Sequence, residues 1–451
     1  MKNWVRSFAA TALVMLVCVA SVIGQPISAE QKQEILDALK NQVDRHAYTS
    51  GVDFAKLPEM IEKNREALDK AVDVKAFNSA LNGALKGFGI SHLRVLSPQI
   101  ASTRNSTTRV GVGISTRKTD DGLLIQDVIE GGPAEGAGVR TGDLIIKIDG
   151  QPATATEALG GDEGTKVVLT LRREDKAEED VSVTRGKFST RKPETLVIVE
   201  PRAAVLRIPT FSVGYDLKNI ESLFARAKKE NVKELVLDLR GNGGGRVSNL
   251  SHLLGFFLPR DTEVGTRVSR ALAKQYTEAT GDAGTDALLI AKWAKRNYVV
   301  RATQENRFTG KVAVLIDRGS ASASEITAAA LRELRSAPLI GTPSAGAVLV
   351  SSHRPLAEGW EVQIPLSDYV TVKGVRLEAH KLQPDVEAKG PRAKDNGMDE
   401  AVRAALKKLR DMPGEAGTPS SDEANKPAGA EGAVENEKPA PMVPVPSTVG
   451  P

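Results

Sequence analysis

The chemistry in this chain centres on a serine-rich turn, G-S-A-S-A-S-E, at Gly319–Glu325. An apolar β-branched run at Lys311–Asp317 precedes it and predicts a buried strand, and a strong helix former follows at Ile326–Leu334. A strand that runs directly into a helix places the turn at the helix N-terminus, where free N–H groups favour developing negative charge. A serine in that place can be a nucleophile with an oxyanion site built in.

The same turn has a simpler interpretation. Ser322 followed three residues later by Glu325 fits a capping box, in which the two side chains only satisfy the first N–H groups of the helix. The turn alone therefore does not decide between a catalytic and a structural serine.

Composition limits the classes of function. The chain has 451 residues, of which 41% are hydrophobic and 26% charged, which is typical of globular proteins with two or three cores. The formal net charge is only +4 and no basic block is present, so nucleic-acid binding has no support. No residues have metal-ligand spacing and no cofactor motif occurs, so we expect neither metal nor cofactor. The oligomeric state stays open.

Residues 1–24 have the pattern of a secretory signal peptide, in which basic residues precede an apolar run from Phe8 to Ile23. The run is too short for a convincing membrane span, and cleavage after Gly24 or after Ala29 fits equally well. The only cysteine, Cys18, lies inside the run, so the mature protein is predicted to have no disulfide and no thiol nucleophile. We therefore expect a periplasmic or secreted protein without stable membrane insertion after signal removal.

Four segments follow the signal peptide. Residues 29–100 have helical spacing and lead through a turn that contains Ser91-His92 into a strand. Residues 104–187 have the pattern of a small β-rich domain. From 195 to 411 strands and helices alternate, which predicts a mixed, mostly parallel sheet with covering helices. Residues 412–451 are rich in Pro, Ala and Glu and are predicted to be disordered.

The elements expected in the 195–411 segment can be placed more closely. Strands are predicted at Ala203–Ile208 and Glu234–Leu239, and an amphipathic helix at Leu217–Lys229. Two separate strands are predicted later, at Glu361–Pro365 and Tyr369–Leu377.

The strand at Glu234–Leu239 runs into R-G-N-G-G-G. Its last three glycines allow positive φ or close backbone approach just where a strand meets a helix. A phosphate-binding loop is an alternative, but the lysine and hydroxyl of a P-loop are missing, so an oxyanion site fits better. Asp238 and Arg240 are expected to anchor the strand end and the glycine loop.

Residues 104–187 resemble a PDZ domain. R-V-G-V-G-I at Arg109–Ile114 forms a glycine-interrupted strand, and Pro133-Ala134 opens a short helix. PDZ domains bind an extended peptide by β-augmentation and hold its C-terminal carboxylate in a nest of backbone N–H groups. The alternative is that the domain serves only as a spacer. The resemblance places the nest at Val110, Gly111, Val112 and Gly113.

Three features coincide: D-L-R-G-N-G-G-G at 238–245, S-A-S-A-S-E at 320–325, and a PDZ domain before both. Together they resemble the tail-specific (C-terminal processing) and tricorn-core family of serine peptidases. The resemblance implies a ClpP/crotonase-like α/β core. It also implies that Ser322 is the nucleophile and that the backbone N–H groups of Gly244 and Ala323 form the oxyanion hole.

The base requires a choice between two branches of that family. The tail-specific branch uses a lysine in a G-K-G turn, but the matching turn here, 344–347, has Ala347 in that place. The tricorn-like branch uses a Ser-His pair before the PDZ domain and a glutamate shortly before a Pro-Asp. Ser91, His92 and Glu378 match it in the correct order. This similarity implies His92 as general base, supported by Ser91 and Glu378, since an imidazole of pKa near ~6.5 can accept the serine proton.

Other histidines offer alternatives. His380, beside Glu378, is the rival base, whereas His252 on an apolar helix face is expected to be structural. The resulting prediction is a periplasmic or secreted serine endopeptidase that takes unfolded or C-terminally presented polypeptides as extended strands. Two alternatives remain: a catalytically inactive PDZ scaffold that binds peptides, and a hydrolase of non-peptide esters.

Overall fold

The structure is a computed structural model that describes residues 25–173, 177–294, 298–302, 304–393 and 398–413. The predicted signal peptide and all but the first two residues of the predicted tail lie outside these ranges. The described elements belong to one compact unit, Met1–Arg410, except that the last helix ends at Asp411.

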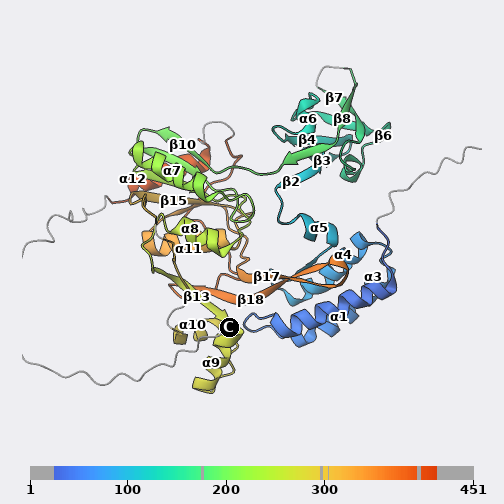
Figure 1. Cartoon of the computed structure of the whole chain (residues 1–451). Helices are drawn as coiled ribbons and strands as arrows, with labels where there is room; N and C mark the ends of the chain where they lie inside the picture. Colours follow the sequence, from blue (N-terminus) through green and yellow to red (C-terminus); the bar gives the residue numbers. More distant parts are fainter. Residues whose placement is uncertain (1–24, 174–176, 295–297, 303, 394–397, 414–451) are drawn as a thin grey trace, which may run out of the picture. The chain divides into compact units, whose positions relative to one another are not determined.

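The centre of the core is a six-stranded sheet of order β10-β11-β12-β15-β16-β19 (Figure 1). Neighbours from β11 to β19 are parallel and only β10 is antiparallel to its neighbour, which confirms the predicted mostly parallel sheet. Its interior strands are continuous apolar runs because a sheet covered on both faces buries every side chain. The strands are β10 (Thr195–Glu200), β11 (Ala203–Arg207), β12 (Glu234–Asp238), β15 (Lys311–Ile316), β16 (Leu339–Gly341) and β19 (Val386–Glu387).

Helices follow the strands of this sheet. α7 (Leu217–Lys229) has the predicted bounds and begins at Asp216, whose side chain accepts the Asn219 N–H. α11 (Ala323–Arg335) begins directly at the serine turn, and every residue from Ala323 to Leu331 is buried, which explains its small alanine side chains. The remaining covering helices are α8 (Val247–Leu254) and α12 (Glu400–Asp411).

A second, antiparallel sheet is organised on one long strand, β18 (Glu361–Thr371). The prediction of two strands at Glu361–Pro365 and Tyr369–Leu377 was wrong, because the chain continues through Pro365. The proline lies where the pairing with β17 skips one residue, at a bulge that does not need its missing N–H. The strands that pair with β18 are β1 (Arg94–Leu96), β13 (Glu263–Ser269) and β17 (Leu349–Pro355), and β14 (Tyr298–Val299) pairs with β13.

β18 also joins the N-terminal helices to the core. Phe77 packs edge-on against Trp360, with ring centroids 5.6 Å apart, and Val362 and Ile364 belong to the same apolar cluster. The segment around His92 is therefore next to a well-packed apolar cluster. The N-terminal helices are α1 (Ala29–His46), α2 (Leu57–Lys63), α3 (Arg65–Lys70), α4 (Val74–Leu85) and α5 (Pro98–Thr103).

The β-rich segment has its own apolar cluster and a separate sheet of order β3-β4-β5-β7-β8. A four-residue helix, α6 (Pro133–Gly136), opens at the predicted Pro133. β3 is an edge strand of this sheet. The strands are β2 (Thr108–Gly111), β3 (Ile114–Thr119), β4 (Gly122–Val128), β5 (Leu144–Ile148), β6 (Gln151–Pro152), β7 (Lys166–Arg172), β8 (Glu179–Thr184) and β9 (Gly186–Ser189).

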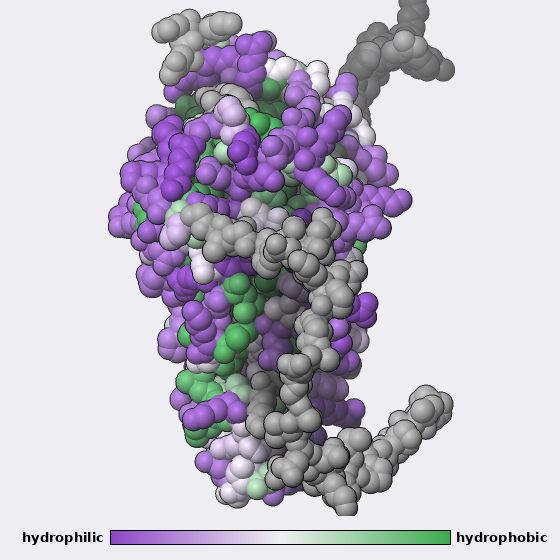
Figure 2. Space-filling view, turned by 90° about the vertical axis from the view of Figure 1, so that its left-hand side faces the viewer, coloured by the Kyte–Doolittle hydropathy of each residue, from purple (hydrophilic) through white to green (hydrophobic). Residues whose placement is uncertain are grey.

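Two helices between β13 and β14 carry exposed apolar side chains. α9 (Arg270–Thr280) and α10 (Ala287–Ala294) pack on each other, and Leu288, Leu289 and Trp293 of α10 remain exposed. Figure 2 shows a mostly hydrophilic face with apolar residues gathered toward its lower end, at the height of α10 in Figure 1.

A buried carboxylate ties the N-terminal segment to β18. Asp368 is fully buried and accepts hydrogen bonds from the Thr49 hydroxyl (2.8 Å), the Ser50 N–H (2.5 Å) and Arg376 Nε (2.7 Å). Replacing Asp368 with Ala leaves the partly buried guanidinium of Arg376 without its counter-charge. We expect the free energy of unfolding to fall by about 3 kcal/mol or more, measured by urea denaturation. Glu62→Ala, which removes an exposed ion pair, is the control and should change stability by about 0.5 kcal/mol or less; equal losses in both variants would contradict the assignment.

Candidate active site

Ser322 occupies a strained position between β15 and α11. Its backbone has φ 56° and ψ −116°, a conformation that a residue with a Cβ rarely adopts. Its N–H is shared between the Ala347 carbonyl (3.0 Å) and Glu325 Oε2 (3.1 Å), so contacts on two sides hold the turn. The strain is maintained by its surroundings, as at a nucleophile elbow, where a sharp strand-to-helix turn exposes the serine hydroxyl.

Glu325 does more than the predicted helix cap. Its side chain is fully buried and also accepts the Ser344 hydroxyl (2.6 Å), the Gly346 N–H (2.8 Å) and the Ala347 N–H (3.0 Å). Burial raises the pKa of this carboxyl, while the hydrogen bonds act in the opposite direction. The carboxylate thus joins the serine turn to the 344–347 turn, the place where the tail-specific branch carries its lysine.

The predicted base, His92, and its two predicted supporting residues, Ser91 and Glu378, form one chain of hydrogen bonds. The Ser91 hydroxyl donates to Glu378 Oε2 (2.8 Å) and lies 2.6 Å from His92 Nδ1, and the Ser91 N–H donates to Glu378 Oε1 (2.7 Å). A hydroxyl has one hydrogen, so once it is given to Glu378 the oxygen must accept from Nδ1–H. This fixes the tautomer that leaves the lone pair of Nε2 free, which is the form required of a base.

His92 is held in an unusual environment. Its φ is 58°, and its pKa is lowered to about 4, first by burial and then by electrostatic interactions with Arg94 and His353. The imidazole is therefore neutral at physiological pH and able to accept a proton.

The glycine loop lies directly against the serine. A Cβ at Gly244, which has φ +88°, would lie 2.8 Å from the Ser322 Cβ, so only glycine allows this approach. The Gly244 N–H donates to Asn242 Oδ1 (2.9 Å) in this structure. To serve as an oxyanion donor it has to share or exchange that bond. The Ala323 N–H, at the first residue of α11, belongs to the helix turn that has no intrahelical acceptor.

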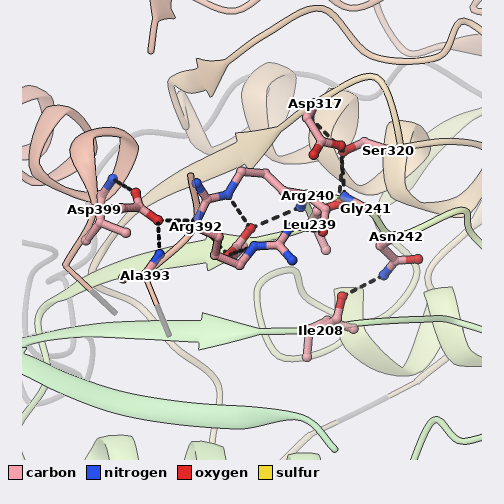
Figure 3. Close-up of polar contacts among 12 residues, drawn as sticks. Ile208, Leu239, Arg240, Gly241, Asn242, Asp317, Ser320, Arg392, Ala393 and Asp399 are labelled. Carbon is pink, nitrogen blue, oxygen red and sulfur yellow. Dashed lines mark hydrogen bonds and ion pairs between the residues drawn. The ribbon is translucent and has the colours of Figure 1, made fainter. Parts of the chain in front are cut away.

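Two residues, Asp317 and Asn242, connect the glycine loop to the serine turn by hydrogen bonds (Figure 3). Asp317 Oδ1 accepts the N–H groups of both Gly241 and Gly319, each at 2.8 Å. The Asn242 carbonyl accepts the Ala321 N–H (3.1 Å), while its side-chain amide donates to the Ile208 carbonyl (2.8 Å). These bonds fix the separation between the serine turn and the glycine loop.

The anchoring role expected of Asp238 and Arg240 is present in the structure. Arg240 Nε and Nη2 each lie 2.9 Å from an Asp238 oxygen, and Nη2 lies 2.8 Å from Asp399, just before α12 (Figure 3). Arg392 donates to the Arg240 carbonyl. This buried, paired network holds the start of the glycine loop.

Several of the predicted site residues line one groove of about 670 Å³. Ser322, His92 and Gly244 all line it, together with Ala323. The rival base His380 is exposed, does not line this groove and has Nδ1 3.0 Å from the Glu378 carbonyl. His252 is buried and pairs with the Tyr215 hydroxyl (2.9 Å), in agreement with a structural role.

The four residues of the predicted peptide-binding nest do not lie in one strand. Val110 and Gly111 belong to β2 and are paired with β9, whereas Val112 and Gly113 precede the edge strand β3. The carbonyls of Val112 and Gly113 accept N–H groups of Ala134 and Ile129. Within the described part of the chain, no group of three or more His, Cys, Asp or Glu side chains is arranged to hold a metal ion.

Sequence reasoning missed several contributors. The Val348 N–H donates to Glu378 Oε2 (2.8 Å), and His353 lines the groove with His92. A backbone N–H donor, or a neighbour on another strand, leaves no pattern in the local amino-acid sequence. Asn242 was detectable in principle, since it lies inside the glycine cluster.

Comparison with known protein families shows which families parts of this chain resemble. The PDZ domain family matches residues 110–184, and peptidase family S41 matches residues 202–388. Residues 202–388 are thus a peptidase S41 domain. The chain is therefore a serine-type peptidase with a PDZ domain.

Several similar proteins are named as proteases. The chain is 26% identical over 359 residues to the carboxy-terminal processing protease CtpA of Bacillus subtilis (strain 168), covering 77% of this chain and 71% of that protein. It is 25% identical over 288 residues to a probable CtpA-like serine protease of Staphylococcus haemolyticus (strain JCSC1435), covering 62% of this chain and 53% of that protein. Among solved structures, a photosystem II D1 C-terminal processing protease aligns with a TM-score of 0.46 and 22% identity, covering 80% of this chain and 94% of that one.

The environment of His92 predicts the pH dependence of this S41 peptidase. A base must be unprotonated, so kcat/KM on an uncharged, amidated peptide should persist down to about pH 4 and fall as the pH drops through the lowered pKa. Arg94→Gln removes a cation that lowers this pKa, so its acid limb should move to higher pH. Arg45→Gln, an exposed charge on α1, should leave the limb in place. A wild-type limb near ~6.5, the ordinary histidine value, contradicts the assignment.

Proposed function

We propose that this chain is a periplasmic or secreted serine endopeptidase that cleaves unfolded or C-terminally presented polypeptides through an acyl-enzyme on Ser322. The observation that carries the proposal is the Glu378–Ser91–His92 chain of hydrogen bonds, which ends at the groove that Ser322 also lines. A histidine so oriented supplies the base that Ala347 cannot supply in place of the family lysine.

Each group has a defined task in the proposed reaction. His92 Nε2 takes the proton of Ser322 Oγ as that oxygen attacks the scissile carbonyl carbon. The Ala323 N–H, and the Gly244 N–H once it is shared with or released from Asn242, stabilise the negative oxygen of the tetrahedral intermediate. His92 then gives its proton to the leaving amine. A water activated by the same imidazole hydrolyses the acyl-enzyme.

Glu378 and Ser91 act through the imidazole. The buried carboxylate holds the Ser91 hydroxyl, and that oxygen accepts Nδ1–H. When His92 becomes positively charged, this polar chain stabilises the imidazolium against the cost of burial. Such support is needed because burial disfavours the charged form of His92 and so lowers its pKa.

The PDZ domain is proposed to deliver substrate. β3 is the edge strand of its sheet, and an edge strand can pair with an extended peptide through main-chain hydrogen bonds. The relatives named carboxy-terminal processing proteases support a substrate presented by its C-terminus. The basic-apolar pattern of residues 1–24 supports export. No helix in the described ranges has both the length and the apolarity to cross a membrane.

Replacement of Ser322 with Ala tests the proposal. If Ser322 is the nucleophile, cleavage of an unfolded protein should fall by about 10⁴-fold or more, whereas thermal unfolding should change little. A fluorophosphonate probe should label the wild type and not the variant. If Ser322 were only a cap, stability would fall by about 1 kcal/mol and cleavage would persist.

Two histidine variants distinguish the base. His92→Ala should be as damaging as Ser322→Ala, whereas His380→Ala is the matched control and should retain wild-type cleavage. An active His92→Ala enzyme overturns the role of the imidazole. A folded wild type that binds peptide but neither cleaves nor reacts with the probe supports the inactive PDZ scaffold instead.

A further inference from the structure

The active-site groove has one sign of charge. Its charged side chains are those of Arg94, Arg104 and Arg246, and no aspartate or glutamate is among its described lining residues. A groove lined by a single sign of charge focuses the field and attracts a ligand of the opposite sign. A substrate segment that carries a carboxylate therefore suits it.

The three arginines are not equivalent. Arg104 is neutralised by Glu361, with which it forms two hydrogen bonds. Arg94 and Arg246 are exposed to the groove, and among the described residues neither has a carboxylate within ion-pair distance. Their charges are thus available to a ligand.

Arg94 is held in a fixed orientation. In the antiparallel sheet it is the register partner of Gln363, and Gln363 in turn is the partner of His353. Arg94 Nε donates to Gln363 Oε1 (2.9 Å), while Gln363 Nε2 donates to Ser351 Oγ (2.8 Å). Because Nε is used in this way, the two terminal nitrogens of the planar guanidinium are left for a ligand. That fork matches the geometry of a carboxylate.

The two free cations flank the reacting groups in sequence. Arg94 follows His92 by two residues, and Arg246 follows Gly244 by two residues, and all four line the same groove. The apolar residues Leu349 and Val350 also line the groove. The segment that fits has an apolar residue close to an acidic group.

We propose that Arg94, oriented by Gln363, binds a carboxylate of the polypeptide substrate beside the scissile bond, with Arg246 as a second cation at the glycine loop. This rests on the proposed peptidase function and names the substrate class as acidic polypeptide segments. The carboxylate is either an acidic side chain or the free C-terminus of the substrate.

Binding at Arg94 has a consequence for the base. The positive charge of Arg94 is one cause of the lowered pKa of His92. A substrate carboxylate paired with Arg94 offsets that charge, so the imidazole of the complex becomes a better proton acceptor. An acidic substrate should therefore raise kcat as well as lower KM.

The test uses the Ser322→Ala protein, so that binding is measured without turnover. The ligands are short acetylated peptides with an apolar centre and either one Glu or one Gln. The position of this residue varies from peptide to peptide. Each peptide is made both as a C-terminal amide and as a free acid. Fluorescence anisotropy measures Kd at low and high salt. We expect the Glu peptide, or the free acid, to bind about fivefold tighter than its uncharged counterpart at low salt, and the difference to shrink at high salt.

Variants then assign the effect to the groove. Adding Arg94→Gln to the Ser322→Ala protein should abolish the preference, Arg94→Lys should retain part of it, and Arg45→Gln should leave it unchanged. If Arg94→Gln removes the difference in Kd between the Glu and Gln peptides, Arg94 binds a side-chain carboxylate. If it removes the difference in Kd between the free acids and the amides, Arg94 binds the C-terminus. Either result supports the proposal. A preference that survives Arg94→Gln, or no preference in any peptide, overturns it. Absence of cleavage by the wild type would contradict the peptidase function, while these affinities would still decide the carboxylate site.

Discussion

The site depends on one buried carboxylate, Glu378. It accepts the N–H and the hydroxyl of Ser91 and the N–H of Val348, and so joins three segments that are distant in the sequence. Its side chain is only 3% exposed, and a buried carboxylate is tolerated only with such partners. These bonds hold the 89–92 turn in place, and through Ser91 they determine which nitrogen of His92 faces the groove with a free lone pair.

A second constraint fixes Ser322, the proposed nucleophile. The serine turn and the glycine loop follow neighbouring parallel strands, β15 and β12, so both emerge at the same sheet edge. Asp317 and Asn242 bridge the two loops, and Glu325 joins the serine turn to the 344–347 turn. Ser322 can keep its positive φ because these contacts surround it. The strain is local, and the support comes from three different loops.

Much of this arrangement was predictable, but its hydrogen bonds were not. The parallel sheet follows from buried apolar runs that alternate with helices, and Ser322, His92, Ser91 and Glu378 were predicted from the family resemblance of their motifs and their order in the chain. The bond between Ser91 and Glu378 spans 287 residues, so no local pattern encodes it. Glu325 was interpreted only as a cap because its contact with the 344–347 turn is equally non-local. The prediction divided β18 because a proline commonly ends a strand, whereas a bulge in β18 itself, next to Pro365, accommodates the proline.

The most direct test of the account is a crystal structure of the protein with a peptide boronate bound. We predict a covalent bond from Ser322 Oγ to boron, with His92 Nε2 within about 3 Å of one boronate oxygen and another oxygen at the Ala323 N–H. The bonds from Glu378 to Ser91 and from Ser91 to Nδ1 should remain. An adduct on Ser322 contacted by His380 or a lysine, with His92 turned away from it, would contradict the account.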